Sequence, residues 1–340
     1  MLTTPRFMIA LLSFAAILFL IAFTSTATSA SSYREPSDSN PSAAGAGAGP
    51  AVNTALREKL ALAERLWEQA VVDREAMAAR MGFDQKFPDG YNNPYNIWDF
   101  ARPSFFCPHD MERVGTLGDG GKVVCGMSRY ETFSPGPSSA TNPARELVVY
   151  SFGVNDDSSF EAALLQRTNA QIWGYDYSVD KWAKHIPSHR LSRAYFKKAG
   201  IGKQTDETKQ PPFYNVQDLM KINGHDYVDI VKMDIEGFEY DALTSLVDFI
   251  TSTPTGSHNG SLPFGQLLVE MHLYDGDRPH GSPANIRAWM EWWSALEKLG
   301  LRPANNEDNW IGDVVYGKPR FMEYTMINAL NKERNMLLWD

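Results

Sequence analysis

Three carboxylates occupy the six residues from Asp234 to Glu239, directly after the apolar run Val228–Met233. A short apolar run of this kind is typical of a buried strand, so the carboxylates are expected at the carboxyl end of that strand. Like charges this close raise one another's pKa unless a cation or a donor offsets them. We therefore interpret the stretch as part of a reaction site, with Glu236 as a candidate general base.

A second pair of reactive side chains, Glu270 and His272, stands at the end of another apolar run, Leu267–Met271. Because side chains alternate along a strand, these two should share one side of it. The ordinary pKa of imidazole lies near neutral pH, which makes His272 a candidate general base and Glu270 an alternative. A purely structural histidine is the other interpretation.

The same residues permit a metal-assisted variant. Asp234 and Glu270 would end adjacent strands and could offer oxygen ligands to Mg²⁺ or Mn²⁺. Such an ion would lower the pKa of a bound hydroxyl. Removal of the metal with a chelator would then abolish activity.

Two further strand ends point to a nucleotide-type ligand. Gly153, followed by Val154 and Asn155, comes directly after the apolar run Leu147–Phe152, and a glycine there lets a ligand approach the backbone. Asp176 ends the next predicted strand, 23 residues after Gly153. An acidic residue at that place can accept hydrogen bonds from both hydroxyls of a ribose. A surface helix cap is the alternative for Asp176.

An alternating framework of strands and helices would position these residues. Strands are predicted at 147–152, 172–175, 193–199, 228–233, 267–271, 300–304 and 321–328. Helices are predicted at 159–168, 216–222, 240–250 and 285–299. This alternation indicates a mostly parallel sheet with helices on both faces, which binds ligands at the carboxyl ends of its strands.

A hairpin and a disulfide are predicted before this framework. The turn Asp119-Gly120-Gly121 between two apolar runs indicates a β-hairpin over 113–125. A glycine-rich phosphate cradle is the alternative, but no helical pattern follows the turn. Cys107 and Cys125, the two cysteines, lack metal-ligand spacing, so a single disulfide is favoured over two buried thiols.

The N-terminus is typical of a membrane-targeting segment. Residues 7–23 are nearly all apolar and follow Arg6, which favours an uncleaved signal anchor and a type II protein of the Golgi or endoplasmic reticulum with a luminal body. A cleaved signal and a secreted protein are the alternative. Asn259 begins a glycosylation sequon, which is compatible with either location.

Composition and spacing divide the remaining chain. The predicted divisions are a signal anchor at 1–23, a disordered stem at 24–50, an amphipathic helix at 51–81 and the catalytic domain at 82–340. The helix is expected to pack on the body. A homodimer through a coiled coil at 52–81 is the alternative, and Arg74 on the apolar seam disfavours it. The net charge of −9 gives no sign of a nucleic-acid partner.

Several stretches in order resemble the methyltransferase-like protein 24 family, which is related to FkbM-type methyltransferases. They are YSFGVNDDSSFE, the strand-ending Asp176, VKMDIEGFE, QLLVEMHL, and the DGGK turn with Cys125. The resemblance runs from about Phe105 to Asn328. It implies a class I, Rossmann-like, seven-stranded methyltransferase sheet and S-adenosylmethionine as the methyl donor.

The resemblance also implies roles for single residues. It places the cofactor's methionine part at Gly153 and Asn155, the ribose at Asp176, the adenine near Gly200 and Ile201, and the reacting methyl group at Asp234 and Glu236. Val154 and Tyr177 are expected as further cofactor-binding residues. The chain departs from many methyltransferases in its single glycine after the first strand, and in Ser151 where an acidic residue often stands.

The expected reaction is methylation of a hydroxyl or carboxyl group, with His272, Glu236 or Glu270 as the base. The acceptor, which could be a small molecule, a glycan or a protein, has no motif in the sequence; its pocket is expected from 82–110 and 203–212. Two other functions are considered. A Golgi glycosyltransferase could use the acidic pair Asp275 and Asp277, or the pair Asp234 and Glu236, to hold the metal ion of a nucleotide sugar. A catalytically inactive protein could keep the fold and bind a ligand.

Overall fold

The computed structural model describes residues 54–84, 97–133, 146–252, 260–273, 280–317 and 319–339. All of them belong to one unit of the chain, residues 52–340. The predicted signal anchor and stem lie outside the described residues. So do the sequon residue Asn259 and the acidic pair Asp275 and Asp277.

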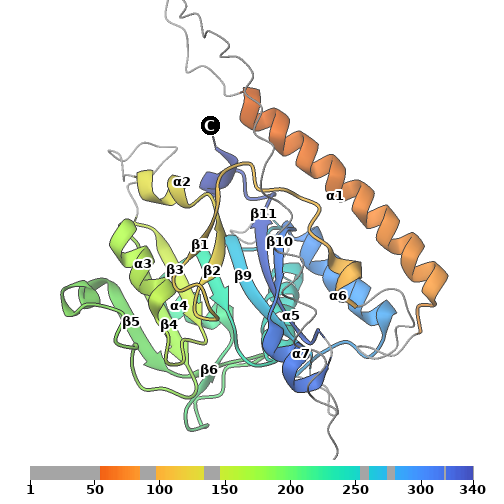
Figure 1. Cartoon of the computed structure of the whole chain (residues 1–340). Coiled ribbons are helices and arrows are strands. Elements are labelled where there is room, and N and C mark those ends of the chain that lie inside the picture. Colours follow the sequence, from red (N-terminus) through yellow and green to blue (C-terminus); the bar gives the residue numbers. More distant parts are fainter. Residues whose placement is uncertain are drawn as a thin grey trace, which may run out of the picture. The chain divides into compact units, whose positions relative to one another are not determined.

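Seven strands form the central sheet, in the order β10-β11-β9-β8-β3-β4-β5 (Figure 1). Their bounds are β3 Val148–Phe152, β4 Gln171–Asp176, β5 Ala194–Lys198, β8 Val228–Met233, β9 Phe264–His272, β10 Leu301–Asp308 and β11 Phe321–Asn328. The pairs from β5 to β9 are parallel, whereas β11 runs antiparallel to both of its neighbours. The predicted Rossmann-like, seven-stranded sheet is confirmed.

The remaining elements surround this sheet. The helices are α1 Thr54–Met81, α2 Met127–Thr132, α3 Ser159–Arg167, α4 Val216–Asn223, α5 Glu239–Ser252, α6 Ile286–Lys298 and α7 Trp310–Tyr316. Short 3₁₀ turns lie at Ile97–Ala101, Ser188–Arg193 and Met336–Leu338. Two small sheets pair β1 Met111–Val114 with β2 Lys122–Cys125, and β6 Gly200–Ile201 with β7 Phe213–Tyr214.

The strand order reverses at β3. The chain continues from β3 to β4 on one side, whereas β8 pairs with β3 on the other side. Connections that leave a parallel sheet in opposite directions open a crevice at the carboxyl ends of the strands. The fold therefore places a ligand site beyond β3, β4 and β8.

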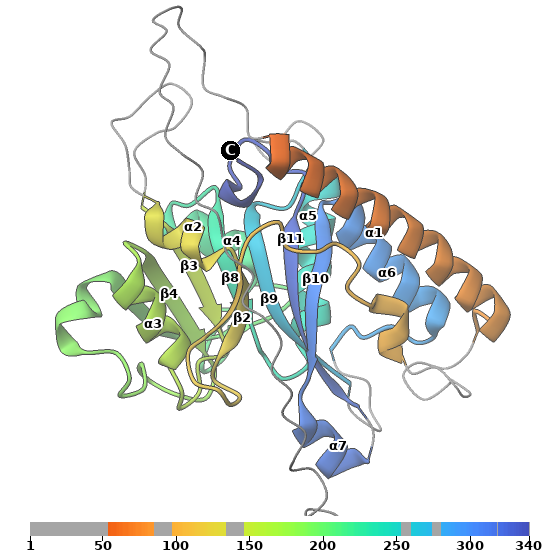
Figure 2. The same ribbon diagram turned by 45° about the horizontal axis from the view of Figure 1, so that its top comes forward.

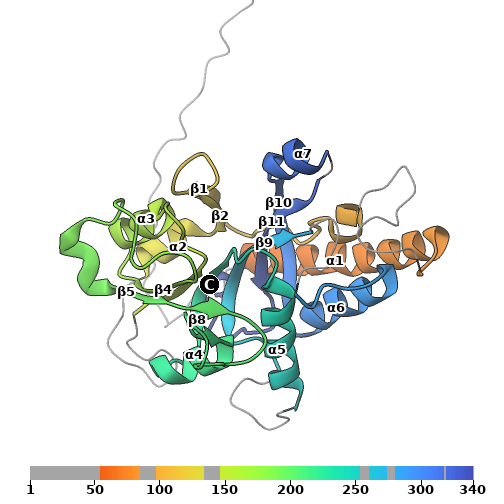
Figure 3. The same cartoon turned by 90° about the horizontal axis from the view of Figure 1, so that it is seen from below.

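The sheet separates two apolar cores, because neighbouring side chains of a strand point to opposite faces. In β3, Val149 belongs to the core under α3 and the β1–β2 hairpin, and Tyr150 belongs to the core under α4, α5 and α6. Figure 3 shows α4 and α5 on the side of the sheet away from α3 and the hairpin. Both faces are covered, as predicted.

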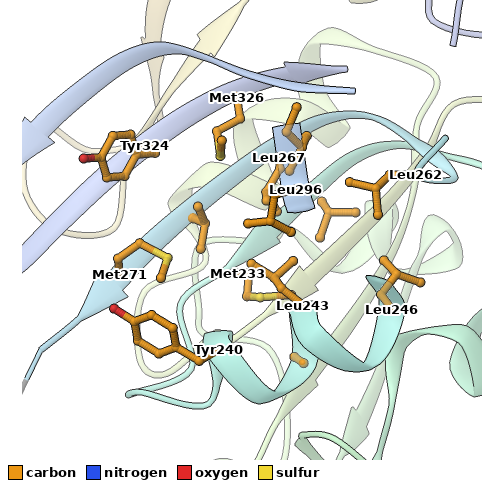
Figure 4. Close-up of a cluster of buried hydrophobic side chains, with 14 of the residues drawn as sticks. Met233, Tyr240, Leu243, Leu246, Leu262, Leu267, Met271, Leu296, Tyr324 and Met326 are labelled. Atoms are coloured by element: carbon orange, nitrogen blue, oxygen red, sulfur yellow. The ribbon is translucent and has the colours of Figure 1, made fainter. Parts of the chain in front are cut away.

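The larger core joins the sheet to α5 and α6 (Figure 4). Met233 of β8, Leu267 and Met271 of β9, and Tyr324 and Met326 of β11 are all buried in it. Leu243, Leu246 and Leu296 complete the cluster from the helices. Burial of such side chains stabilises the fold by about 1.5–3 kcal/mol each, so the strands that carry the site rest on a rigid support.

On the opposite face, the β1–β2 hairpin lies against β9 and β11 (Figure 2). Two sets of polar contacts fix it there. The Gln266 side chain accepts from the N–H of Cys125 at 2.8 Å and donates to its carbonyl at 3.2 Å. Thr325 donates to the carbonyl of Val123 at 2.6 Å. The predicted disulfide between Cys107 and Cys125 is present and ties β2 to the segment before β1.

The predicted amphipathic helix is α1, and its apolar face packs on the body. Arg74, on that face, forms a buried ion pair with Glu297 of α6. Trp67 donates to the same carboxylate at 3.0 Å. The predicted homodimer stays a prediction. Among the described residues, no helix has the length and apolarity needed to cross a bilayer.

The predicted strands and helices are all present, with shifts of a few residues at their ends. The structure adds the six-residue helix α2 directly after the hairpin, where no helical pattern was found, as well as α7 and the two-residue strands β6 and β7, none of which was predicted. Two residues are too few to show alternation, and α7 has only seven. Strand β10 also continues to Asp308 through polar residues whose pattern gave no strand signal.

Candidate functional site

A pocket of about 970 Å³ lies at the carboxyl ends of β3, β4, β8 and β9, between the β1–β2 turn and α7. Every residue that the sequence analysis assigned to cofactor binding or catalysis lines it. These residues are Gly153, Val154, Asn155, Asp176, Tyr177, Gly200, Ile201, Asp234, Glu236, Glu270 and His272. The fold thus brings all of them together, while the role of each stays a prediction.

The loops after β3 and β8 touch at Gly153, where no side chain fits. Gly153 has φ 77°, and a Cβ atom there would lie 1.6 Å from the carbonyl oxygen of Asp234. The Gly153 N–H donates to Tyr175 O, and the Asp234 N–H donates to Phe152 O, each at 3.0 Å. Asn155 is also left-handed, with φ 48°, and such strain persists only where the surroundings fix it. This wall of the pocket is bare, rigid backbone.

The buried carboxylate of Asp176 holds the loop after β3. Its Oδ2 accepts from the N–H groups of Val154 at 2.7 Å and Asn155 at 2.8 Å. Its Oδ1 accepts from the N–H and hydroxyl of Ser178 and from the N–H of Val179. Burial raises the pKa of Asp176, but these donors lower it below its ordinary value. A ribose would have to share this carboxylate with the loop.

The part of the pocket beside β6 is apolar. Ala199, Gly200, Ile201 and Phe213 line it together with the ring of Tyr177. A Cβ atom on Gly200 would lie 2.6 Å from the Phe213 ring, and the rings of Tyr177 and Phe213 are 5.5 Å apart. Glycine leaves the Phe213 ring uncovered, so a flat aromatic group could pack here.

Glu239 joins the loop after β8 to His272. The side chain is fully buried, and its Oε1 accepts from the N–H of Ile235 at 2.9 Å and of Gly237 at 3.3 Å. The same oxygen lies 3.0 Å from Nδ1 of His272. The loop carries Glu236 in a left-handed conformation, φ 57°. Sequence analysis counted Glu239 in the acidic stretch but assigned it no role.

The other ring nitrogen of His272 faces three carboxylates. Nε2 lies 3.7 Å from Glu236, 3.9 Å from Asp234 and 4.0 Å from Glu270. Burial lowers the pKa of His272, but Glu239, Asp234 and Glu270 raise it, to about 10. The ring therefore holds a proton at neutral pH, and this proton disfavours the predicted role of His272 as the base.

A lysine from the hairpin completes the cluster. The Lys122 ammonium lies 2.7 Å from Glu323, 3.1 Å from Asp234 and 3.7 Å from Glu270. Burial raises the pKa of Glu270, as does Asp234, to about 8. Burial also raises the pKa of Asp234, but Lys122 and His272 bring it below its ordinary value. Sequence analysis missed Lys122 and Glu323, and the DGGK turn was the only signal for the lysine.

Two groups of side chains within the described residues have the spacing of metal ligands. Asp234, Glu236 and His272 form one, and Asp119, Glu270 and Glu323 the other, with the ligand atoms of each within 4.8 Å of one another. The predicted metal pair, Asp234 and Glu270, is divided between the two groups. Both carboxylates instead share the Lys122 ammonium.

The β1–β2 turn and α7, both of which contribute to the lining of the pocket, form two edges on the same side of the sheet (Figure 3). Leu117 in the turn is 93% exposed, and Trp310 and Val314 of α7 are 74% and 81% exposed. Asn309 joins the edges, because its side chain donates to Asp119 at 3.0 Å and to Glu270 at 2.9 Å.

Residues 61–311 match the model of a family described as a methyltransferase domain. No curated protein matches the chain.

Three solved structures match parts of the chain at low identity. The N-terminal domain of EvdMO1, with SAH and D-fucose, is 11% identical, with a TM-score of 0.29 over 54% of this chain and 76% of that chain. SMU.776 in complex with SAH is 9% identical, with a TM-score of 0.31 over 53% of this chain and 44% of that chain. The [4+2]-cyclase SpnF is 10% identical, with a TM-score of 0.31 over 66% of this chain and 90% of that chain. This chain therefore spans under half the length of SMU.776.

Proposed function

Because this chain belongs to the methyltransferase domain family, which its match over residues 61–311 establishes, we propose that its pocket binds S-adenosylmethionine and that the enzyme methylates a hydroxyl or carboxyl group. The predicted enzyme class, an S-adenosylmethionine-dependent methyltransferase, is confirmed. The observation that carries the proposal is that one pocket at the strand ends gathers every predicted site residue.

The lining of the pocket suits the parts of this cofactor in turn. The bare backbone at Gly153, where there is no side chain, would receive the methionine part. The apolar wall at Gly200, Ile201 and Phe213 would receive the adenine. Asp176 lies between these two regions and would meet the ribose, and Asp234 would face the positively charged sulfonium.

The cofactor supplies an activated methyl group, and the chain must orient the acceptor and take its proton. The acceptor oxygen forms a bond to the methyl carbon as the bond from sulfur to that carbon breaks, and the acceptor proton passes to a carboxylate. Glu236 and Glu270 are the candidates that this cluster leaves for the base. Because the pKa of Glu270 is raised to about 8, Glu270 would serve as the base only in alkaline solution, and Glu236 is the candidate at neutral pH. A carboxyl acceptor would already be ionised and would need no base.

His272 fits a positioning role in this scheme. Its protonated ring faces Asp234, Glu236 and Glu270, and its other nitrogen is held by Glu239. A fixed positive charge among these carboxylates keeps them oriented and compensates their mutual repulsion. The proposed reaction includes no metal, since Lys122 contacts both predicted ligands, Asp234 and Glu270.

The proposed location is the lumen of the secretory pathway, with the chain held by its N-terminal apolar segment. The disulfide between Cys107 and Cys125 supports this, because disulfides persist in oxidising compartments. The glycosyltransferase alternative finds no support in the family match.

Calorimetric titration of the full chain with S-adenosylhomocysteine tests the proposal. We expect micromolar binding, weakened about tenfold or more in Asp176→Asn, because the amide cannot accept from all five donors that the carboxylate holds. Asp180→Asn is the matched control, since Asp180 pairs with Lys198 at the surface, outside the pocket.

Absence of binding by a folded wild-type sample would refute the proposed cofactor. Binding without turnover of any hydroxyl or carboxyl acceptor would favour the catalytically inactive alternative. Nucleotide sugars with Mn²⁺ serve as the comparison ligands, and we expect no binding of them to this pocket.

A further inference from the structure

Lys122 reaches the site from outside the sheet. It begins β2 of the hairpin, and its side chain is buried. The ammonium also lies 3.4 Å from the carbonyl of Asp119, in the turn of its own hairpin. A lysine is almost never buried unless it is paired, so the hairpin contacts on β9 and β11 serve to hold this group in place.

The three carboxylates around the ammonium come from three neighbouring strands. Asp234 follows β8, Glu270 belongs to β9 and Glu323 belongs to β11. Glu270 and Glu323 are directly paired in the antiparallel register of β9 and β11. Opposed like charges destabilise a sheet, and the Lys122 ammonium, 2.7 Å from Glu323 and 3.7 Å from Glu270, offsets this repulsion.

The carboxylates exceed the cations in this cluster. Asp234, Glu236, Glu270 and Glu323 contribute the acidic groups, and the positive charges that act on Asp234 come from Lys122, His272 and Lys232. Buried carboxylates at this spacing usually share a proton or bind a divalent ion. Here the ammonium meets the oxygens at 2.7–3.7 Å, within reach of charge-assisted hydrogen bonds to the nearer two.

We propose that Lys122 is the resident cation of this site, in the place of a divalent metal, and that it positions Asp234 and Glu270 for the proton transfer that accompanies methylation. Lys122 does not line the pocket, so it is a positioning residue that acts through these carboxylates. The catalytic part of the inference rests on the proposed function, whereas the electrostatic part is testable without any methyl acceptor.

The hairpin thereby becomes part of the reaction site. A metal ion would be delivered from solution and could be lost, whereas this cation is covalently part of a segment tied down by a disulfide three residues later, at Cys125. The charge on Asp234 would then depend on the position of the hairpin against β9 and β11. The structure thus links an outlying hairpin to the chemistry at the strand ends.

A double-mutant cycle tests the electrostatic part. The unfolding equilibrium in urea at pH 7.5 is measured for the full-length wild type, Lys122→Met, Glu323→Gln, the double variant and Lys122→Arg. Lys122→Met should raise the unfolding constant about 100-fold or more, because it leaves buried carboxylates without their cation. In the Glu323→Gln background, the rise caused by Lys122→Met should be at least tenfold smaller than in the wild type. The unfolding constant of Lys122→Arg should stay within about tenfold of the wild-type value, because arginine keeps the positive charge. Lys184→Met, an exposed lysine in no described ion pair, is the control.

Uptake of Mn²⁺ is the measurement that a packing role of Lys122 would leave unchanged. The loss of unbound Mn²⁺ signal by electron paramagnetic resonance should show that Lys122→Met binds one ion more than wild type, at the oxygens that the ammonium leaves. If the single variant does not fold, the double variant and Lys122→Arg still complete the comparison through their Mn²⁺ count and stability.

Three results would overturn the proposal: additive effects of Lys122→Met and Glu323→Gln, equal losses in Lys122→Met and Lys122→Arg, or an unchanged Mn²⁺ count. The proposed function fails separately, by the absence of S-adenosylhomocysteine binding to the wild type. A sample that binds the cofactor and shows additive mutations would reject the lysine role alone.

Discussion

Glu239 has no contact with solvent, yet three groups of the site depend on it. Its Oε1 is shared by the N–H groups of Ile235 and Gly237 and by the ring of His272. The first two contacts fix the loop that carries Glu236, and the third fixes the ring. Burial lowers the pKa of His272, and the charge of Glu239 is the largest of the effects that nevertheless raise it to about 10.

Replacing Glu239 with Gln should therefore lower the pKa of His272 by at least one unit. The amide oxygen can still accept from the backbone, but the negative charge is gone. A ¹H–¹⁵N titration of the imidazole nitrogens measures this pKa directly. Glu236→Gln is the control, since that side chain is 75% exposed and water screens its charge. Equal shifts in both variants would contradict the role of Glu239.

The sign of the stability change follows from linkage. The folded-state pKa of His272, about 10, lies above its ordinary value of 6.5, so its stabilisation is complete below pH 6.5 and lost as the pH rises through 10. The melting temperature of wild type should fall over that window, and that of Glu239→Gln should fall less.

The residues of the site differed in how well the sequence revealed them. Asp234, Glu270 and His272 end apolar strands, so their sequence neighbours were enough to predict a shared location. Lys122 and Glu323 were missed because their contact spans 201 residues and crosses from the hairpin to the last strand. No local pattern encodes such a pairing, which depends on where the hairpin rests.

At the scale of the elements, the position of the β1–β2 hairpin depends on redox conditions, because a disulfide holds it. Cys125 ends β2, and its bond to Cys107 closes a short loop that holds the strand carrying Lys122. The disulfide was predicted from the cysteine count, whereas its bearing on the site follows only from the position of the hairpin over β9 and β11.

Reduction of the disulfide should lower the unfolding free energy by about 2–4 kcal/mol and weaken S-adenosylhomocysteine binding severalfold. The hairpin turn lines the pocket, and a looser turn would contact the ligand less often. Urea unfolding and calorimetry with and without a phosphine reductant measure both effects. Cys107→Ser should show the same losses and no further response to the reductant, and a response in that variant would point to another cause.

The framework of strands and helices was predictable for a physical reason. Strands β3, β8 and β9 are buried on both faces, so their apolar runs are nearly continuous. Helix α6 shows its burial at three- and four-residue spacing, from Ile286 to Leu296. Helix α7 is different, because its apolar residues are largely exposed and carry no periodic signal of packing.

At the scale of the whole described unit, α1 is joined to the body by ionic contacts as much as by apolar ones. Arg74 and Glu297 are both buried, and Glu64 binds Arg302, whose guanidinium lies 3.4 Å from the centre of the Trp67 ring. The arginine that weakened the coiled-coil interpretation is thus a link between the helix and α6.

Arg74→Ala should destabilise the protein by about 3–5 kcal/mol, because the Glu297 carboxylate would remain buried without its main cation. Urea unfolding measures the loss. The double variant Arg74→Ala/Glu297→Ala should recover part of the lost stability, because no buried carboxylate then remains without a cation. Arg80→Ala, at the exposed end of the same helix, should cost less than about 0.5 kcal/mol. Full additivity of the two substitutions would show that the pair is not coupled.

The place of β11 in the sheet has a consequence for biosynthesis. This strand is the last of the sheet in the chain, yet it lies between β9 and β10, and β10 has no other partner in the sheet. Glu323, a partner of Lys122, belongs to it. At roughly 5–20 residues per second, translation adds Glu323 about 10–40 s after Lys122. A nascent chain therefore carries the lysine, and then Asp234 and Glu270, before the third carboxylate exists, and the cluster around Lys122 is complete only after β11 has been made.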